Sequence, residues 1–141
     1  MIQVKVNCPY CKNSLMDSEN LLDGSPSVHV VVQYGNKRGN VYLSSVYGSY
    51  NIKSEIDLPI NEIFIFFCHR CNSVLITTHL CEECHAPMVA FDFIEGSRIL
   101  ICSRRGCKKH FIEFENLEKQ ITAFYSAYPV YFSPTSRKKE E

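Results

Sequence analysis

Eight cysteines arranged in four close pairs constrain this chain more than any other feature of its sequence. The pairs, which leave no cysteine over, are Cys8-Pro-Tyr-Cys11, Cys68-His-Arg-Cys71, Cys81-Glu-Glu-Cys84 and Cys102-Ser-Arg-Arg-Gly-Cys107. A C-x2-C turn directs two thiolates at one ion, while backbone N–H groups of the turn donate to the sulfurs. Because two pairs complete a tetrahedral four-cysteine site, the sequence predicts two metal sites, and Zn²⁺ is favoured over Fe because zinc held by four thiolates is the common structural solution.

Other interpretations of the cysteines agree less well with the sequence. Free thiols behave as small buried hydrophobes, which would explain one or two cysteines but not four close pairs. A thioredoxin-like redox motif would need a βαβ pattern around a C-x2-C pair, and no such pattern surrounds any pair. Five histidines are present, but eight thiolates already fill two sites, so we expect the histidines at the surface or beside the ligands.

The ends and apolar runs of the sequence bear on its compartment. The segment from Met1 to Cys8 lacks the long apolar stretch of a secretory signal. No apolar run approaches the ~20 residues of a membrane span. We therefore expect a cytoplasmic protein without membrane contact, where paired cysteines are metal ligands more often than disulfides.

The residues between the third and fourth cysteine pairs form a predicted β-hairpin, with strands over 88–94 and 98–102 and a turn over 95–97. This order of knuckle, hairpin and knuckle, from Cys81 to Cys107, resembles the zinc-ribbon class. By implication, Cys8 to Cys71 is a second ribbon whose hairpin is enlarged by an insertion over residues 12–67. The C-x4-C spacing of the last pair departs from the commoner spacing of two residues.

The resemblance implies which pairs share an ion: Cys8, Cys11, Cys68 and Cys71 form site 1, and Cys81, Cys84, Cys102 and Cys107 form site 2. Two other groupings remain open. A cross-braced grouping, with the first pair joined to the third and the second to the fourth, would resemble RING-like domains. A nested grouping would place the second and third pairs around one ion, since the short connection between them can still form a tight ribbon.

Short runs of β-branched and aromatic residues between turn signals predict a mostly β fold, with two small antiparallel sheets. Besides the hairpin, we expect strands over residues 28–34, 41–46, 62–67, 73–78 and 108–115. One short amphipathic helix is predicted after the last strand, beginning at Asn116 and ending at Pro129.

These elements divide the chain into three predicted parts. Residues 1–79 form the first ribbon with its β insertion, and residues 80–132 form the second ribbon with the additional strand and the helix. Residues 133–141 are polar and form a flexible tail.

The sequence offers little support for catalysis. It lacks the P-loop, the dinucleotide-binding glycine motif, the H-E-x-x-H zinc motif and the G-x-S-x-G elbow, and no His-x-Glu precedes a Pro-Cys-x-x-Cys as in zinc deaminases. Four thiolates also close the metal shell and leave no position for a substrate or a reactive water. We therefore expect structural metals in a protein that is not an enzyme and has no small-molecule substrate.

Charge limits the partners. With 15 basic and 15 acidic side chains, the net charge is zero, so no overall positive field draws the protein to nucleic acid. The densest local cluster, Arg104, Arg105, Lys108 and Lys109, lies around Cys107. These cations either contact phosphates or offset the −2 charge of a zinc ion held by four thiolates, and we favour the second interpretation.

Tyr47 and Tyr50 lie in an aromatic and polar run that suits an adaptable protein contact. The first functional hypothesis is therefore an adaptor or accessory subunit that binds a protein partner. A nucleic-acid-binding zinc ribbon is the second hypothesis, and a rubredoxin-like iron electron carrier is the third.

Overall fold

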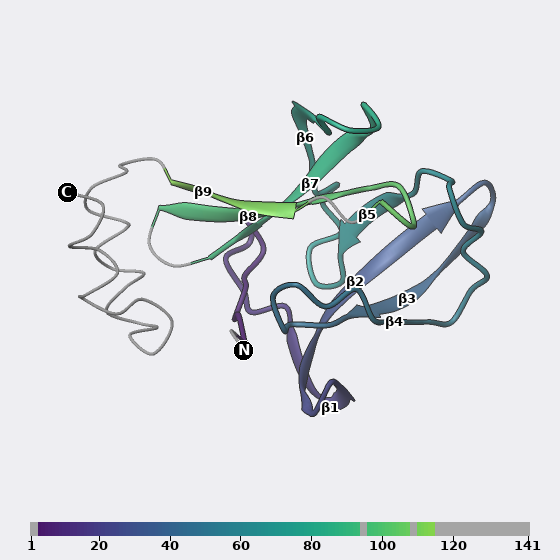
Figure 1. The fold of residues 1–141 in the computed structure, drawn as a ribbon. Helices are drawn as coiled ribbons and strands as arrows, with labels where there is room; N and C mark the ends of the chain where they lie inside the picture. The colour runs from purple at the N-terminus through teal and green to yellow at the C-terminus, as the bar shows by residue number, and fades with distance from the viewer. Residues whose placement is uncertain (1–2, 94–95, 108–109, 115–141) are drawn as a thin grey trace.

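The computed structural model describes residues 3–93, 96–107 and 110–114 of the 141-residue chain. The described residues form nine strands in two antiparallel sheets (Figure 1), which confirms the predicted mostly β fold with two small sheets. Among these residues there is no helix long and apolar enough to cross a membrane. The predicted helix from Asn116 to Pro129 and the predicted tail lie outside the described residues.

The first sheet has five strands: β1 (Met16–Leu22), β2 (Ser25–Tyr34), β3 (Lys37–Leu43), β4 (Ile52–Ser54) and β5 (Ile65–Cys68). Strands β1 to β4 follow one another in order. Strand β5 pairs with β2 from Val30 to Gln33, beyond the part of β2 that pairs with β1. The long insertion therefore builds most of the sheet that carries the Cys68 knuckle.

The second sheet has four strands in chain order: β6 (Ile76–Leu80), β7 (Pro87–Asp92), β8 (Ser97–Cys102) and β9 (His110–Phe114). Strands β7 and β8 pair from Met88 with Cys102 to Asp92 with Arg98, which confirms the predicted hairpin between the third and fourth cysteine pairs. Strand β9 confirms the described part of the strand predicted over residues 108–115.

Strand β1 was not predicted, because its residues are mostly polar and do not alternate. The turn that follows β1 is nevertheless recognisable from the sequence. Asp23 and Gly24 connect β1 to β2 with φ of 55° and 75°, and an Asp-Gly pair with positive φ at both positions is the preferred two-residue hairpin turn. The Asp-Gly dipeptide was therefore the evidence for a strand on its N-terminal side.

Leu75 connects the two sheets. Its amide donates to the carbonyl oxygen of Phe66 in the first sheet (2.9 Å), and its own carbonyl accepts from the amide of Ala90 in the second (3.1 Å). The strand that leaves the Cys68 knuckle thus pairs first with β5 and then, as β6, with β7. The predicted boundary between residues 79 and 80 falls within β6, and the division into two units stays a prediction.

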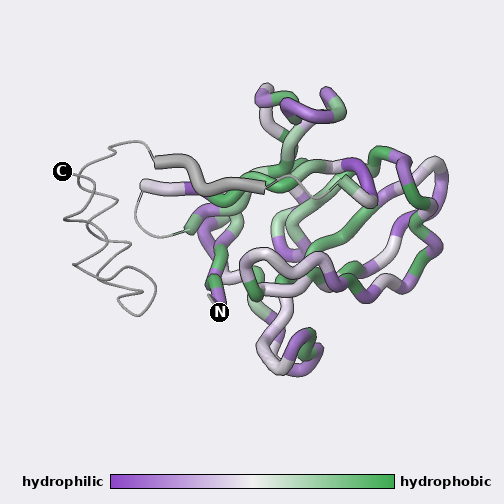
Figure 2. The backbone as a smooth tube through the Cα atoms, in the orientation of Figure 1, coloured by the Kyte–Doolittle hydropathy of each residue, from purple (hydrophilic) through white to green (hydrophobic). Residues whose placement is uncertain are grey.

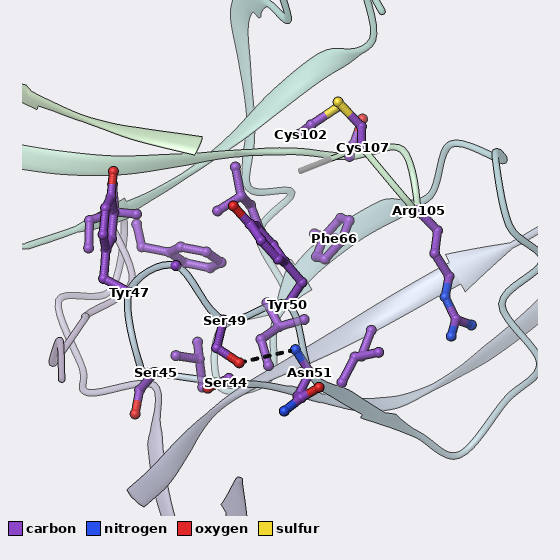
Figure 3. A pocket seen from close by; sticks show the side chains of 18 of the residues that line it. Ser44, Ser45, Tyr47, Ser49, Tyr50, Asn51, Phe66, Cys102, Arg105 and Cys107 are labelled. Carbon is purple, nitrogen blue, oxygen red and sulfur yellow. Dashed lines mark hydrogen bonds between the residues drawn. The ribbon is translucent and has the colours of Figure 1, made fainter. Parts of the chain in front are cut away.

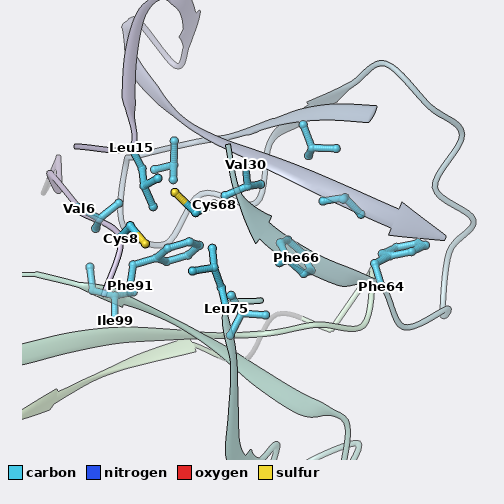
Figure 4. Close-up of a cluster of buried hydrophobic side chains, with 14 of the residues drawn as sticks. Val6, Cys8, Leu15, Val30, Phe64, Phe66, Cys68, Leu75, Phe91 and Ile99 are labelled. Carbon is cyan, nitrogen blue, oxygen red and sulfur yellow. The ribbon is translucent and has the colours of Figure 1, made fainter. Parts of the chain in front are cut away.

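Most of the hydrophobic core is shared by the two sheets (Figure 4). Val30 and Phe66 from the first sheet pack in one cluster with Phe91 and Ile99 from the second. Figure 2 shows hydrophobic residues gathered where β2, β5, β7 and β8 meet, with hydrophilic residues at the outer turns. Burial of each such side chain contributes about 1.5–3 kcal/mol, so each sheet supplies stability that the other needs.

Strand β7 is buried on both faces. Val89 and Phe91 point into the shared core, whereas Met88 and Ala90 pack with Leu100 in a second cluster around the second cysteine group. Side chains alternate along a strand, so a strand that is covered on both sides has no polar face. This explains why the sequence of β7 is continuously apolar from Met88 to Phe91.

Candidate metal centres

The three C-x2-C knuckles share one backbone conformation. In each, the amide four residues after the first cysteine donates back to the carbonyl of that cysteine, at 2.9 to 3.0 Å; the pairs are Lys12 with Cys8, Asn72 with Cys68, and His85 with Cys81. Lys12, Asn72 and His85 have φ of 64°, 63° and 64°. This left-handed position reverses the chain, so that both cysteines of a knuckle face the same point.

The first cysteine group forms where knuckles from distant parts of the chain meet. The Sγ atoms of Cys8 and Cys71 lie 3.7 Å apart, and those of Cys11 and Cys68 lie 3.8 Å apart. All four sulfurs lie within 4.8 Å of one another. In a tetrahedral Zn–S4 centre with bonds of about 2.3 Å, neighbouring sulfurs are about 3.8 Å apart, so the observed spacing fits such an ion.

The second group joins the third knuckle to the C-x4-C pair. Cys81 Sγ lies 3.7 Å from Cys107 Sγ, and Cys84 Sγ lies 3.3 Å from Cys102 Sγ. None of the eight cysteines is in a disulfide. The sulfurs therefore gather in the sequential grouping implied by the zinc-ribbon resemblance, and neither the cross-braced nor the nested grouping forms.

Backbone amides point at the sulfurs from within the knuckles. The amides of Tyr10 and Cys11 lie 3.3 and 3.5 Å from Cys8 Sγ. In the second knuckle, the amides of Arg70 and Cys71 lie 3.3 and 3.4 Å from Cys68 Sγ. Such donors stabilise thiolates and orient them toward a shared ion, which is the arrangement that the C-x2-C spacing predicts.

The thiols of each group differ in acidity. Hydrogen bonding to the side chain and backbone of Ser73 lowers the pKa of Cys71 to about 6. Burial acts to raise the pKa of Cys84, but hydrogen bonds from Ala86 and Arg104 outweigh it and bring that pKa to about 6. Burial raises the pKa of Cys8 to about 12. Four thiolates can therefore coexist at neutral pH only when a cation compensates their charge.

The longer spacing of the last cysteine pair has a structural role. The residues inside this knuckle pair with the segment that leads into β5: Phe64 N donates to Ser103 O (3.1 Å), Arg105 N to Glu62 O (3.0 Å), and Asn61 N to Arg105 O (2.9 Å). A two-residue knuckle would not offer a backbone long enough for these bonds. The C-x4-C departure thus ties the second cysteine group to the first half of the chain.

The two arginines of the basic cluster make contacts inside the protein. Arg104 donates from Nη1 to the carbonyl oxygen of Asn61 (2.6 Å), and its guanidinium also hydrogen-bonds Cys84, which raises the pKa of Arg104. Arg105 donates to the carbonyl oxygen of Leu58. Both side chains are half-buried. Arg104 is thus placed to offset thiolate charge, while Lys108 and Lys109 lie outside the described residues.

Tyr47 and Tyr50 lie in the loop of residues 44–51 between β3 and β4. Tyr47 packs against the shared core, and burial raises its pKa, whereas Tyr50 is 47% exposed. Both line a cavity of about 330 Å³ between this loop and the second sheet (Figure 3). Sequence reasoning missed this cavity, because its walls come from segments that only the fold brings together.

Among the side chains that the structure describes, no histidine joins either cysteine group. His69, inside the second knuckle, is half-buried, and its Nδ1 hydrogen-bonds the carbonyl oxygen of His29 at 2.9 Å. The two imidazole rings stack with centroids 4.0 Å apart. His69 therefore supports the knuckle from beside the sulfurs, as expected for a histidine that is not needed as a ligand.

The two groups of four sulfurs could each hold one metal ion. Four thiolates complete the shell of a tetrahedral ion and leave no ligand position for a substrate or a water. When the chain is compared with known protein families, with characterised proteins and with solved structures, none of them matches it.

Proposed function

We propose that this chain is a non-enzymatic, cytoplasmic module of the zinc-ribbon type, in which two Zn²⁺ ions fix a surface that binds a protein partner. Structural zinc is supported by two closed groups of four cysteines. Three pairs of sulfurs, Cys8–Cys71, Cys11–Cys68 and Cys81–Cys107, lie 3.7–3.8 Å apart. Eight cysteines without a disulfide agree with a reducing compartment. Zinc is preferred to iron because closed zinc sites with four thiolates commonly serve as structural centres.

The observation that carries the binding role is a row of exposed aliphatic side chains beside the Cys68 knuckle. We call Ile63, Ile65, Val74 and Ile76 the aliphatic row; each of them is exposed. Phe67 pairs with Val74, and Leu75 N bonds Phe66 O, so the same register places Ile65 opposite Ile76.

Alternation along the two strands puts the whole row on one face, opposite the buried Phe66 and Leu75. Grouped apolar side chains exposed to water mark interaction surfaces more often than scattered ones do. The knuckle that turns between Phe67 and Val74 carries two of the four site 1 sulfurs, so a metal at site 1 would fix the geometry of the row.

The experiment compares partners captured by the metal-loaded chain with those captured by Ile65→Glu, which places a charge in the centre of the row. Leu21→Glu is the matched control, because Leu21 is also an exposed aliphatic residue but lies on β1, outside the row. We expect quantitative mass spectrometry to show proteins that are lost with Ile65→Glu and kept with Leu21→Glu. Identical sets from all three baits would contradict the proposal.

The metal is tested on the same preparations. We expect elemental analysis to give two zinc atoms per chain and a colourless protein, even after growth in iron-rich medium. A red protein containing iron would instead support the rubredoxin-like alternative.

A further inference from the structure

The cavity beneath the loop of residues 44–51 is explained neither by the metal centres nor by the aliphatic row. Its volume of about 330 Å³ lies at the lower end of the range for small-molecule sites, about 300–1,000 Å³. Its floor is apolar and buried, with Val6, Val28, Phe66, Phe91 and Ile99 among the lining residues. A floor of this kind favours an apolar body over a polar one.

One wall of the cavity is the loop of residues 44–51, which hydrogen bonds hold in place. Asp23, in the β1–β2 turn, accepts hydrogen bonds from Ser44 Oγ (2.6 Å), Ser49 Oγ (2.6 Å) and Asn51 Nδ2 (2.7 Å). Figure 3 shows the Tyr47 and Tyr50 rings rising from this loop toward the second sheet. The tyrosines are therefore positioned over the cavity before any ligand arrives, which reduces the entropy cost of binding.

Arg105 adds a positive charge to the lining of the cavity. Arg105 lines it from the C-x4-C knuckle, half-buried, with one guanidinium nitrogen bonded to the carbonyl oxygen of Leu58. Among the residues that the structure describes, no carboxylate forms an ion pair with Arg105. A guanidinium has five N–H donors, so most of its capacity remains for a second acceptor.

We propose that this cavity binds a small amphipathic monocarboxylate, with an aromatic or branched aliphatic body on the apolar floor and its carboxylate on Arg105. At about 30 Å³ for a water-sized group, the volume accepts on the order of ten non-hydrogen atoms. Arginine suits the carboxylate because its fork of donors matches two oxygens at once. The site is separate from the aliphatic row, so it does not depend on the proposed partner binding.

The test is calorimetric titration of the metal-loaded full chain with 4-phenylbutyrate, and with 4-phenylbutyramide as its uncharged counterpart. We expect saturable one-to-one binding of the acid, and binding of the amide weaker by about tenfold or more, since the amide loses the charge-assisted hydrogen bonds. Arg105→Gln should remove this preference. The control is Arg70→Gln, which changes an exposed arginine between Cys68 and Cys71. This variant should still bind the acid more tightly than the amide.

Arg105→Gln also removes the hydrogen bond to the carbonyl oxygen of Leu58. A second variant is therefore needed that tests the cavity without removing this bond. Ile60 lines the cavity and is 60% exposed, so Ile60→Glu places a negative charge at its edge without disturbing the core. We expect this change to abolish binding of the acid, whereas Ile65→Glu, outside the cavity, should leave it unchanged.

Tyr50→Ala should weaken binding, and Tyr10→Ala, which removes an exposed tyrosine outside this cavity, should not. Absence of saturable binding by the acid would overturn the proposal. Equal affinity for acid and amide, or full affinity in Ile60→Glu, would overturn it as well. None of these outcomes depends on whether Ile65→Glu loses a protein partner, so the two proposals fail separately.

Discussion

The amide of Arg105 donates to the carbonyl oxygen of Glu62 over 3.0 Å, and this bond joins the last cysteine knuckle to the segment that enters β5. The segment continues through Phe66 to Cys68, a member of the first cysteine group. A continuous stretch of paired backbone thus runs from one candidate metal centre to the other. Backbone hydrogen bonds, and not only the shared core, therefore join the two centres.

Removal of both metals should unfold the whole chain. Binding at such sites contributes on the order of 10 kcal/mol of folding free energy, which is comparable to the total stability of a small domain. We expect a strong chelator to abolish the dispersed amide NMR spectrum, and zinc to restore it. A metal-free chain with a dispersed spectrum would contradict this prediction.

Substitution of one ligand in each group should remove one metal at a time. Cys11→Ser should leave the metal at site 2, and Cys84→Ser the metal at site 1, because each substituted group retains only three thiolates. Native mass spectrometry should count one zinc in each variant. The control is Ser103→Ala. Ser103 lies between Cys102 and Cys107 but is not a ligand, so this variant should keep two zinc ions.

Arg104 should affect site 2 selectively. Its guanidinium hydrogen-bonds Cys84, and residues that support ligands typically change metal affinity by about tenfold to hundredfold. We expect Arg104→Gln to accelerate release of one of the two zinc ions to a chromogenic chelator, with partial recovery in Arg104→Lys. Arg70→Gln provides the comparison at site 1. Equal release kinetics in wild type and Arg104→Gln would show that this hydrogen bond has no role at the site.

Gly106 lies directly before Cys107 with φ of 93°, a conformation that side chains disfavour. Gly106→Ala should destabilise the protein by about 1–2 kcal/mol in denaturant unfolding. Gly48→Ala places the same strain, at φ of 95°, in a loop away from the sulfurs. We expect a comparable loss of stability in both variants, but faster metal release only in Gly106→Ala.

Asp23 should stabilise the loop of residues 44–51 at every pH used in ordinary work. Hydrogen bonds from Ser44, Ser49 and Asn51 lower its pKa below the usual 3.8. A carboxylate with a lowered pKa contributes fully above its unfolded value, and the contribution is lost only as pH falls through the folded value. Asp23→Asn should therefore lower Tm by the same amount at about pH 6 and about pH 8. A decrease in Tm that depended on pH in this range would contradict the lowered pKa of Asp23.

The cysteine knuckles and the β7–β8 hairpin could be predicted because their signals are local, whereas the grouping of knuckles around each ion was implied only by the resemblance to zinc ribbons. Paired cysteines and alternating apolar residues are short patterns whose chemistry depends on near neighbours. Strand β1 was missed because its polar residues are held by pairing with β2, a partner that only the turn at Asp23-Gly24 indicated.

The roles of the arginines and the cavity could not be predicted, for a different reason. Arg104 and Arg105 reach Asn61 and Leu58 across more than forty residues of sequence, at separations of 43 and 47. The spacing of the basic cluster contains no information about such distant acceptors. The cavity likewise exists only after the loop of residues 44–51 has closed toward the second sheet.

The shared core has a consequence for synthesis on the ribosome. A nascent chain that has emerged as far as Cys71 holds every sulfur of site 1 but lacks Phe91 and Ile99, which cover Val30 and Phe66 in the finished protein. Such an intermediate can bind its first ion while the hydrophobic face of the first sheet is still exposed to water. We expect this surface to remain exposed until β7 and β8 have been synthesised.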